Sequence, residues 1–545
     1  MKYGFIIDNR KCIGCHACTV ACKSEHDVPV GVNRTWVKQI EKGEFPNTKR
    51  LFSVLRCNQC SDAPCVEICP VEALFNRDDG IVDFNSDRCI GCKACMQACP
   101  YDALYIDPES HTAAKCNYCA HRVDIGLEPA CVNVCPEHAI ISGDMENPES
   151  EISQLLAREQ VTVRKPEKGT QPNVFYIDGD QASLNPTATE KSESYYCSTQ
   201  SHGVGHFAKY AEKLSEGKDI LDMARELRGE KLHQREVSFE TGQNGKPKKS
   251  IEVLMDKALA RRVYDTPDKG ILWGWEVSAY ILTKAIAAGT VLIAFLASVL
   301  NLGQASDSFF LTSILTALIF LTITGGLLVK DLDKPTRFAY ILLRPQWNSW
   351  LVKGGYAITF YGGCLTLYLM AHLLNWQLIK ELSLWGSAIL AVIVAIYTAF
   401  LFAQAKGRDF WQSPLLPFHM LVHSLMAGAS TILIISLVLD QEIAWIDLLE
   451  GALVAVVIGN MLILLFEMTI THPTNDAKIT VSMILTGRYS LKFWLIAVTI
   501  GNILPLIFLI IGFDYSGPIA GLMILLGIYY TEQIWIEAPQ RIPLT

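Results

Sequence analysis

Sixteen of the eighteen cysteines lie within the first 136 residues, where they form four groups of four. The third group has the spacing Cys-x2-Cys-x2-Cys-x3-Cys-Pro, a run that binds [4Fe-4S] clusters through thiolates. Three thiolates of such a run bind one cluster and the fourth binds a neighbouring cluster, so the groups work in pairs. Four groups therefore predict four [4Fe-4S] clusters, which pass single electrons. The groups are Cys12, Cys15, Cys18 and Cys22; Cys57, Cys60, Cys65 and Cys69; Cys89, Cys92, Cys95 and Cys99; and Cys116, Cys119, Cys131 and Cys135.

Three other uses of these cysteines fit the spacing less well. Disulfides need an exported chain, and no cleavable signal peptide or twin-arginine segment precedes Cys12. Structural zinc sites use pairs of Cys-x2-Cys rather than a triplet followed by Cys-Pro. Cys12-Ile-Gly-Cys15-His16 also matches the attachment motif of c-type haem, but its place in a longer cysteine series favours a cluster loop. Cys197 and Cys364 stand apart, and we expect neither to bind metal.

The elements that must hold these groups are short. Apolar runs rich in β-formers alternate with the cysteine loops, so we expect an α+β double-ferredoxin domain over residues 1–180 that depends on its metal to fold. The expected strands cover residues 5–8, 52–56, 81–84, 104–107, 139–141 and 175–178. Residues 181–270 are interpreted as a polar linker with amphipathic helices at 208–228 and 251–262; a partner-binding role is the alternative.

The second half of the chain changes character. At 545 residues the chain exceeds a single core, and residues 271–545 are dominated by long apolar runs. Each of eight runs is long enough to cross a hydrocarbon core, which takes roughly 20 residues. We therefore expect an all-α eight-helix transmembrane bundle, whose even count returns the C-terminus to the iron–sulfur side. The runs cover residues 272–300, 309–329, 350–379, 384–404, 415–439, 446–470, 491–513 and 517–536.

Charge indicates the orientation and excludes one class of partner. The net charge is −8 and no basic tract occurs, so we expect no nucleic-acid binding. Basic residues in loops lie on the cytoplasmic side of a membrane. On the opposite side only Lys380 is basic, while Asp440, Glu442 and Asp447 crowd one loop. This places the iron–sulfur domain and both termini in the cytoplasm. The basic residues on the iron–sulfur side are Lys330, Lys334, Arg337, Arg344, Lys406, Arg408, Lys478, Arg488, Lys492 and Arg541.

The four cysteine groups resemble those of the four-cluster electron-transfer subunits of molybdopterin oxidoreductases, the dimethyl sulfoxide reductase and polysulfide reductase B-type chains. The resemblance covers the first 180 or so residues, and only the first group departs, with Cys22-Lys23 in place of Cys-Pro. It implies that the first group pairs with the fourth and the second with the third. The implied ligand sets are Cys12, Cys15, Cys18 and Cys135; Cys22, Cys116, Cys119 and Cys131; Cys57, Cys60, Cys65 and Cys99; and Cys69, Cys89, Cys92 and Cys95.

The apolar half is similar to the NrfD/polysulfide reductase C-type membrane anchor. The motifs that carry the similarity are Trp273-Gly-Trp275-Glu276, Asp331-Leu-Asp-Lys-Pro-x-Arg337-Phe338, Arg344-Pro-x2-Asn348-Ser349-Trp350, Thr486-Gly487 and Phe493-Trp494. Members of that family are quinone-reactive eight-helix proteins that usually lack haem, so the resemblance implies that two subunits are fused here. Some related electron-transfer subunits are exported with a partner, which leaves a periplasmic orientation as the alternative.

Ionisable residues within a spanning helix are costly, which makes them functional candidates. Glu276, Tyr280 and Lys284 lie at i, i+4 and i+8 on one face of the first spanning helix. Lys284 lies roughly 18 Å into the membrane, where it must be neutral or paired. His419 and His423 are further candidates on the fifth helix. We interpret these five residues as groups that take part in quinone protonation.

The resemblance implies a quinone near the start of the first spanning helix, with Trp275, Tyr280, Asp331 and Arg337 as contacts. The structural alternatives are interfacial anchoring for Trp275, a capped loop for 331–337 and a hydrogen bond for the histidine pair.

Two further hypotheses concern the membrane half. Glu467 and Asn460 are expected as partners of Lys284, and a chain Glu276–Lys284–Glu467 would carry protons part-way across the membrane. Haem b is a competitor, but it needs two histidines on facing helices. His372 lies at a different depth from His419 and His423, so we expect no haem.

These observations favour an electron-transfer subunit of a respiratory oxidoreductase. It would move electrons between a separate molybdopterin-type catalytic subunit and the menaquinone or ubiquinone of the cell inner membrane. No nucleophile–base constellation, P-loop or Gly-x-Gly-x-x-Gly site accompanies the cysteines, so substrate catalysis is expected in the partner. The alternatives are a redox-coupled proton-translocating subunit and a structural anchor.

Overall fold

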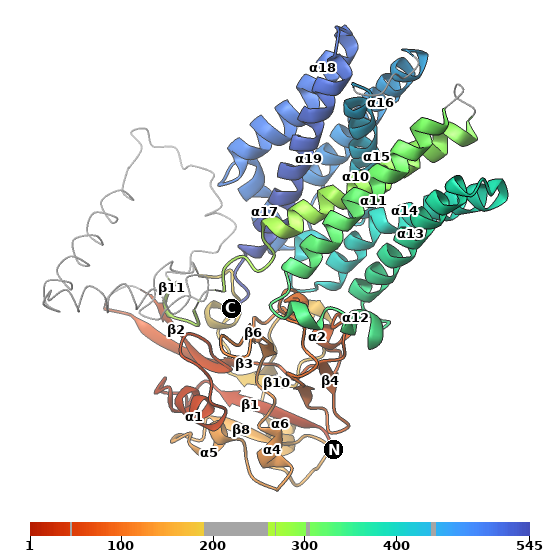
Figure 1. Ribbon diagram of the computed structural model, residues 1–545. Coiled ribbons are helices and arrows are strands. Elements are labelled where there is room, and N and C mark those ends of the chain that lie inside the picture. The colour runs from red at the N-terminus through yellow and green to blue at the C-terminus, as the bar shows by residue number, and fades with distance from the viewer. Residues whose placement is uncertain (44–45, 190–259, 268, 301–305, 438–442) are drawn as a thin grey trace, which may run out of the picture.

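The computed structural model describes residues 1–43, 46–189, 260–267, 269–300, 306–437 and 443–545. Strands and short helices make up the N-terminal part, and long helices make up the C-terminal part (Figure 1). The two parts are stacked end to end, with the cysteine loops of α2 (Pro64–Glu67) nearest to the helices and α1 (Ala17–Glu25) far from them (Figure 1).

Two sheets frame the cysteine loops. The larger has the order β8-β1-β10-β9, in which β1 pairs parallel with β10 and antiparallel with β8. The second has the order β11-β2-β3, and two short hairpins join β4 with β5 and β6 with β7. The strands are β1 (Tyr3–Asp8), β2 (Thr35–Lys42), β3 (Lys49–Arg56), β4 (Leu74–Asn76), β5 (Val82–Phe84), β6 (Tyr105–Ile106), β7 (Ala113–Ala114), β8 (Ile140–Asp144), β9 (Val161–Thr162), β10 (Val174–Ile177) and β11 (Ala260–Tyr264).

Short helices follow the cysteine loops, and two of the loops repeat the same backbone shape. Gly14 and Gly91 have φ of 70° and 72°, and His16 and Lys93, two residues later in each loop, have φ of 62° and 60°. These left-handed positions turn the chain sharply around a cluster-sized space before each helix begins. The helices are α1, α2, α3 (Ala94–Ala98), α4 (Ala120–Val123), α5 (Ala130–Asn133), α6 (Glu151–Arg158), η1 (Pro166–Lys168) and α7 (Gln181–Leu184).

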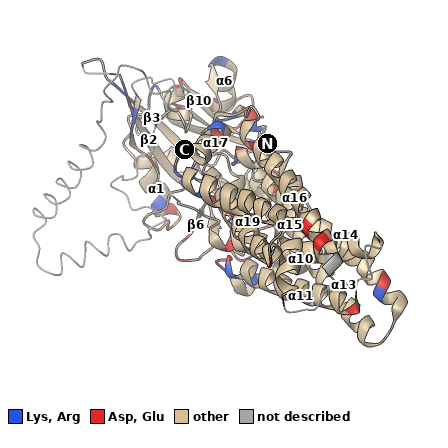
Figure 2. Cartoon of the chain, turned by 90° about the horizontal axis from the view of Figure 1, so that it is seen from above, with Lys and Arg blue, Asp and Glu red and all other residues tan. Residues whose placement is uncertain are grey.

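Seven helices among the described residues are long and apolar enough to span a membrane. Their ribbons in Figure 2 are mostly tan, the colour of residues other than Lys, Arg, Asp and Glu. The one expected span that is not among these seven, residues 350–379, corresponds to α13. This helix has 24 residues but contains more Gly, Tyr and Thr, taken together, than the other spans. The elements are α10 (Trp275–Val299), α11 (Asp307–Lys330), η4 (Pro335–Arg337), α12 (Tyr340–Leu343), α13 (Trp350–Leu373), α14 (Gln377–Gln404), η5 (Asp409–Gln412), α15 (Leu416–Ile435), α16 (Ile443–Thr469), α17 (Asn475–Leu485), π-helix η6 (Lys492–Ile503), α18 (Leu504–Ile511) and α19 (Ser516–Gln540).

Glycines allow the central helices to pack closely. A Cβ atom at Gly289 of α10 would overlap the Ser424 carbonyl of α15, and one at Gly428 would overlap Gly289. Small residues at helix contacts let backbones approach within a membrane, where helices gain little from the hydrophobic effect. This contact brings the polar side chains of α10 and α15 near one another.

A hydrogen-bonded boundary joins the two parts of the protein. Gln540, at the end of α19, accepts hydrogen bonds from Gln97 Nε2 at 2.6 Å and from the backbone of Leu272 and Trp273 at 2.9 and 3.0 Å. The C-terminus also lies at this boundary, since Arg164 Nη2 donates to the Leu544 carbonyl at 3.0 Å. The C-terminus is therefore on the iron–sulfur side of the bundle, as the helix count predicts.

The linker expectation needs one correction. The expected helix at 208–228 and most of that at 251–262 lie outside the described residues. Residues Ala260–Tyr264 form strand β11, which pairs antiparallel with β2, so the helical periodicity does not extend to residue 262. Arg262 is buried there with Asp265, and their side chains are 2.9 Å apart. The end of the expected linker thus belongs to a sheet of the iron–sulfur part.

Candidate functional site

The cysteines expected at the first cluster lie around one cavity. Cys12, Cys15, Cys18 and Cys135 line a space of about 330 Å³ between the first and fourth cysteine loops. The backbone N–H of Ala139 donates to Cys135 Sγ at 3.3 Å. The fold thus brings together residues more than 100 positions apart in the chain, in the set that the resemblance implies.

A second cavity holds another implied set of four. Cys69, Cys89, Cys92 and Cys95 line a space of about 390 Å³ together with apolar side chains. Backbone N–H groups donate to Cys69 Sγ at 3.2 Å and to Cys89 Sγ at 3.4 Å. Such hydrogen bonds stabilise thiolates that ligate an iron–sulfur cluster. The residues of both cavities therefore fit the group that the sequence predicts.

The other eight cysteines also gather in two sets. The Cys60 thiol interacts electrostatically with the thiols of Cys57, Cys65 and Cys99. In the same way, the Cys22 thiol interacts with those of Cys116, Cys119 and Cys131. Fifteen of these sixteen cysteines are partly or fully buried, and the Cys12 set contains the exposed one, Cys15.

A large apolar cavity lies where the iron–sulfur part meets the spanning helices. Its volume is about 890 Å³, including the part that is open to the surroundings, and its lining is mostly apolar. Cys92 and Trp273 line its end toward the clusters, while Tyr280 and Tyr397 lie in its helical wall. Aliphatic side chains make up most of the rest. We call this space the boundary cavity; its lining residues are Cys92, Trp273, Val277, Tyr280, Gly325, Leu328, Asp331, Leu332, Phe338, Ile341, Leu342, Leu351, Gly355, Ile358, Thr359, Tyr397 and Leu401.

Trp273 is fixed between the boundary cavity and the Cys92 loop. Its indole Nε1 donates to the Cys92 carbonyl at 3.2 Å, and its ring stacks on Phe402 and Trp411 with centroid distances of 5.8 and 5.6 Å. It is buried, whereas Trp275 is 48% exposed. The sequence motif contains both tryptophans. Trp275 was the expected quinone contact, but Trp273 is the one that lines the cavity.

Asp331 is the acidic residue of the cavity lining. It follows the last residue of α11 and therefore lies outside the spanning segment. Burial raises the pKa of Asp331 to about 7; the charge of Lys93 opposes this rise, and the charges of Glu276 and Asp333 add to it. A carboxyl group with this pKa is protonated in part of the molecules at neutral pH and can donate a proton.

Two other candidate residues, the expected protonation group Glu276 and the expected contact Arg337, lie outside the cavity lining. Glu276 is 3.8 Å from Lys330 Nζ, and the same ammonium lies 4.1 Å above the ring of Trp275. Arg337 donates to the carbonyls of Ser86 at 2.7 Å and Cys89 at 3.0 Å. Arg337 therefore holds the membrane loop against the third cysteine loop.

Lys284 has partners other than those expected. Its Nζ donates to Thr398 Oγ1 at 2.6 Å and to the Ala395 carbonyl at 3.2 Å, and it lies 4.7 Å from the ring of Tyr397. These contacts do not include Glu276, Glu467 or Asn460. The chain Glu276–Lys284–Glu467 is therefore not formed, because the facing helix at Lys284 is α14 rather than α16.

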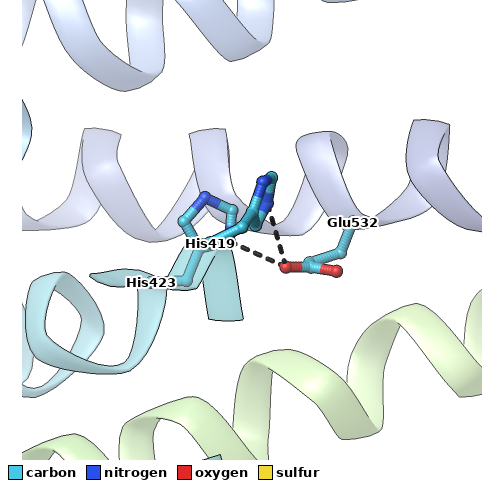
Figure 3. Close-up of side chains that lie close together, drawn as sticks. All are labelled: His419, His423 and Glu532. Carbon is cyan, nitrogen blue, oxygen red and sulfur yellow. Dashed lines mark hydrogen bonds and ion pairs between the residues drawn. The ribbon is translucent and has the colours of Figure 1, made fainter. Parts of the chain in front are cut away.

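Both expected partners are bonded elsewhere. Asn460 donates to Asn502 Oδ1 at 2.9 Å, in π-helix η6. Glu467 Oε2 is 2.9 Å from His419 Nδ1. His423 Nδ1 is 2.7 Å from Glu532 Oε1, a residue of α19 that the sequence analysis missed (Figure 3). A buried glutamate in the last spanning helix was the available signal for it.

Comparisons with known proteins agree with this division of the chain. Residues 11–74 and 48–145 match two families that are each described as 4Fe-4S dicluster domain, and residues 266–525 match the family described as Polysulphide reductase, NrfD. The tetrathionate reductase B subunit of Salmonella typhimurium is 47% identical over 190 residues, which cover 34% of this chain and 76% of the relative. The polysulfide reductase B chain of Wolinella succinogenes is 42% identical over 188 residues, which cover 34% of this chain and 97% of the relative. The arsenate respiratory reductase iron-sulfur subunit of a Shewanella species is 35% identical over 225 residues, which cover 32% of this chain and 96% of the relative.

Proposed function

Because the protein belongs to the family of iron–sulfur subunits of polysulfide and tetrathionate reductases, here continued by an NrfD membrane domain, we propose that it links a catalytic partner to membrane quinone. It is a multi-pass electron-transfer subunit of an oxidoreductase complex. Electrons would pass between the partner and the quinone pool through four [4Fe-4S] clusters.

One observation carries the proposal: Cys92 lines both the cavity of the Cys69 set and the boundary cavity. A cluster held by that set would lie directly beside a molecule in the boundary cavity. Trp273, which also lines the boundary cavity, donates a hydrogen bond to the Cys92 carbonyl. Electron exchange between them would need no further carrier.

The clusters supply one-electron chemistry when bound, and the protein supplies their positions. The Cys12 set has the exposed Cys15 and lies with α1 at the end far from the spanning helices (Figure 1). Ile13 and Val20, beside it, are 55% and 65% exposed. An exposed apolar surface next to a cluster is suited to a redox partner. The partner we propose is a molybdopterin-type catalytic subunit.

The boundary cavity suits a quinone. Its aliphatic walls match a hydrophobic carrier, and its polar groups are few, as expected of small-molecule sites. Quinone reduction needs two electrons and two protons. Asp331 can supply one proton because its pKa is about 7, and the Tyr280 hydroxyl offers a second hydrogen-bond donor. Menaquinone and ubiquinone both meet this description.

We propose that the iron–sulfur part and both termini face the cytoplasm at the inner membrane. The support is the excess of lysine and arginine in the loops on that side. A periplasmic orientation is the alternative, and a cysteine-labelling reagent that cannot cross the membrane distinguishes them. Labelling of Cys15 in metal-depleted spheroplasts would indicate the periplasm, and labelling only after lysis the cytoplasm.

The function is tested with anaerobically purified protein. We expect about sixteen iron atoms per chain, four in each of four clusters. Clusters reduced with dithionite should be reoxidised when a short-chain menaquinone or ubiquinone is added, in a saturable manner. Iron well below this content, or reoxidation that stays proportional to quinone concentration, would contradict the proposal.

A further inference from the structure

Four ionisable side chains from three spanning helices meet inside the bundle, away from the boundary cavity. They are His419 and His423 of α15, Glu467 of α16 and Glu532 of α19, and none is more than 3% exposed. His419 Nδ1 is 2.9 Å from Glu467 Oε2, and His419 Nε2 is 3.7 Å from Glu532 Oε1. One imidazole therefore lies between two carboxylates, a geometry in which each ring nitrogen faces a different proton acceptor.

His423 holds the second carboxylate in place. Its Nδ1 is 2.7 Å from Glu532 Oε1, and the centroids of the two imidazole rings are 4.2 Å apart (Figure 3). Two nitrogen or oxygen ligands of one tetrahedral zinc ion lie roughly 3.3 Å apart, given bonds of about 2.0–2.1 Å. The observed 2.7 Å and 2.9 Å are instead hydrogen-bond distances. The pairs His423–Glu532 and His419–Glu467 are thus hydrogen-bonded, which suits proton transfer; His419, His423 and Glu532 also lie close enough together to hold a metal ion.

One end of this cluster approaches the boundary cavity through Lys284. Glu532 and Lys284 interact electrostatically without a direct ion pair, so this step of the relay requires a bridging water molecule or a rotation of the lysine side chain. Lys284 donates to Thr398 Oγ1 at 2.6 Å, and Thr398 is also hydrogen-bonded to the side chain of Tyr280. Tyr280 lines the boundary cavity. The polar groups therefore reach the wall of the proposed quinone site.

The other end reaches the iron–sulfur side of the bundle. α16 ends at Thr469, two residues after Glu467. Just beyond that end, His472 Nε2 is 3.1 Å from the Glu467 carbonyl, and His472 is partly exposed. His419 is likewise in the first turn of α15, close to η5 at the boundary. Glu467 is thus the group of the cluster nearest to water on the iron–sulfur side.

We propose that Glu467, His419, Glu532 and Lys284 form a proton relay that connects the iron–sulfur side with the boundary cavity. This rests on the proposed quinone function. Each quinone that takes two electrons from the clusters binds two protons to become quinol; the relay delivers one and Asp331 the other. In the oxidative direction the same groups carry the proton away. His423 is a positioning residue, since it orients Glu532.

The relay predicts that both protons are exchanged on the iron–sulfur side. Lys284 has no ionisable partner on the far side among its described contacts, which are Thr398, Ala395 and Tyr397. Quinone chemistry at this site therefore moves no proton across the membrane when electrons also enter from the iron–sulfur side.

Glu467→Gln and His419→Gln test the relay in the complete, cluster-loaded protein. Both should keep the iron content and the affinity for a quinone analogue. Both should slow quinol formation by dithionite-reduced clusters at least about tenfold, because a positioned proton donor contributes about 10²–10⁴-fold. A small weak acid such as imidazole should restore part of the rate. The matched control is Glu450→Gln, at the opposite end of α16, which should behave as wild type.

Lys284→Met tests the other end of the relay and should give the same pattern. Wild-type rates in all three relay variants would overturn the proposal, and so would equal slowing in Glu450→Gln. Failure of the wild-type protein to bind the quinone analogue would instead overturn the proposed function. In vesicles with the iron–sulfur part outside, a pH dye trapped inside should not respond when external dithionite drives quinone reduction. Alkalinisation of the interior would contradict the relay.

Discussion

Two neighbouring glycines of α11 allow the boundary cavity to be tested by filling it. A Cβ atom added at Gly325 or at Gly326 meets no other atom within 4 Å, so both positions have room for a side chain. Only Gly325 lines the cavity; Gly326 is exposed on the outer surface of the bundle. Gly325→Trp should therefore occupy part of the quinone site, while Gly326→Trp should extend into lipid.

The expected loss of affinity follows from the number of ligand atoms displaced. Ligands of drug size gain about 0.3 kcal/mol per non-hydrogen atom. A leucine at residue 325 adds four side-chain carbons, which displaces about 1.2 kcal/mol of binding and weakens it about sevenfold. A tryptophan adds ten heavy atoms, which displaces about 3 kcal/mol and weakens binding on the order of 100-fold.

The assay is titration of a fluorescent quinone-site analogue into detergent-solubilised, cluster-loaded protein. Gly325→Leu and Gly325→Trp should show the graded loss, and the two Gly326 variants should bind as wild type. Iron content serves as the control for folding, because the clusters and their domain assemble together. Equal affinities in the Gly325 and Gly326 variants would refute the assignment of this cavity to quinone.

The remaining predictions concern the boundary between the two parts. Burial raises the pKa of Asp331 to about 7, so the carboxyl loses its proton as pH rises through that value, and wild-type quinone reduction should fall there. Asp331→Asn should be slower below pH 7 and lack this fall, whereas Asp333→Asn should keep a fall, moved to lower pH because the charge of Asp333 adds to the rise in the Asp331 pKa; a fall retained in Asp331→Asn would contradict the role. Gln540→Ala leaves the buried N–H of Trp273 and the part-buried N–H of Leu272 without their acceptor; the buried group alone costs about 1–3 kcal/mol, and the variant should have a lower thermal midpoint. Gln533→Ala, which loses only a contact with Glu537, should not; equal shifts would count against a structural role for Gln540.

The gathering of the cysteines and the presence of long apolar helices could be predicted because both follow local rules. Cysteine spacing is dictated by the geometry of a cluster, and residues such as Cys69 and Cys92 come together as the implied sets require. The hydrocarbon core likewise dictates the length of an apolar run. Neither rule depends on how the helices pack.

The polar groups of the membrane half depend on packing, and the sequence did not determine them. We expected Glu467 to be a partner of Lys284. Lys284 is instead hydrogen-bonded to Thr398 of α14, and Glu467 lies against His419 of α15. Glu532 lies 109 residues from His423, so no local pattern joins them. The choice between Trp273 and Trp275 as the cavity-lining residue also depends on packing, because both lie where α10 begins against the iron–sulfur part.

The contact between the Cys92 set and the boundary cavity is the central claim, and electron paramagnetic resonance tests it directly. The protein is reduced anaerobically until the cluster nearest to the membrane is paramagnetic, and a quinone-site analogue is then added. The spectrum of that cluster should change in the wild-type protein and in Gly326→Trp, and should stay unchanged in Gly325→Trp. A wild-type spectrum that does not respond to saturating analogue would contradict a quinone site beside Cys92.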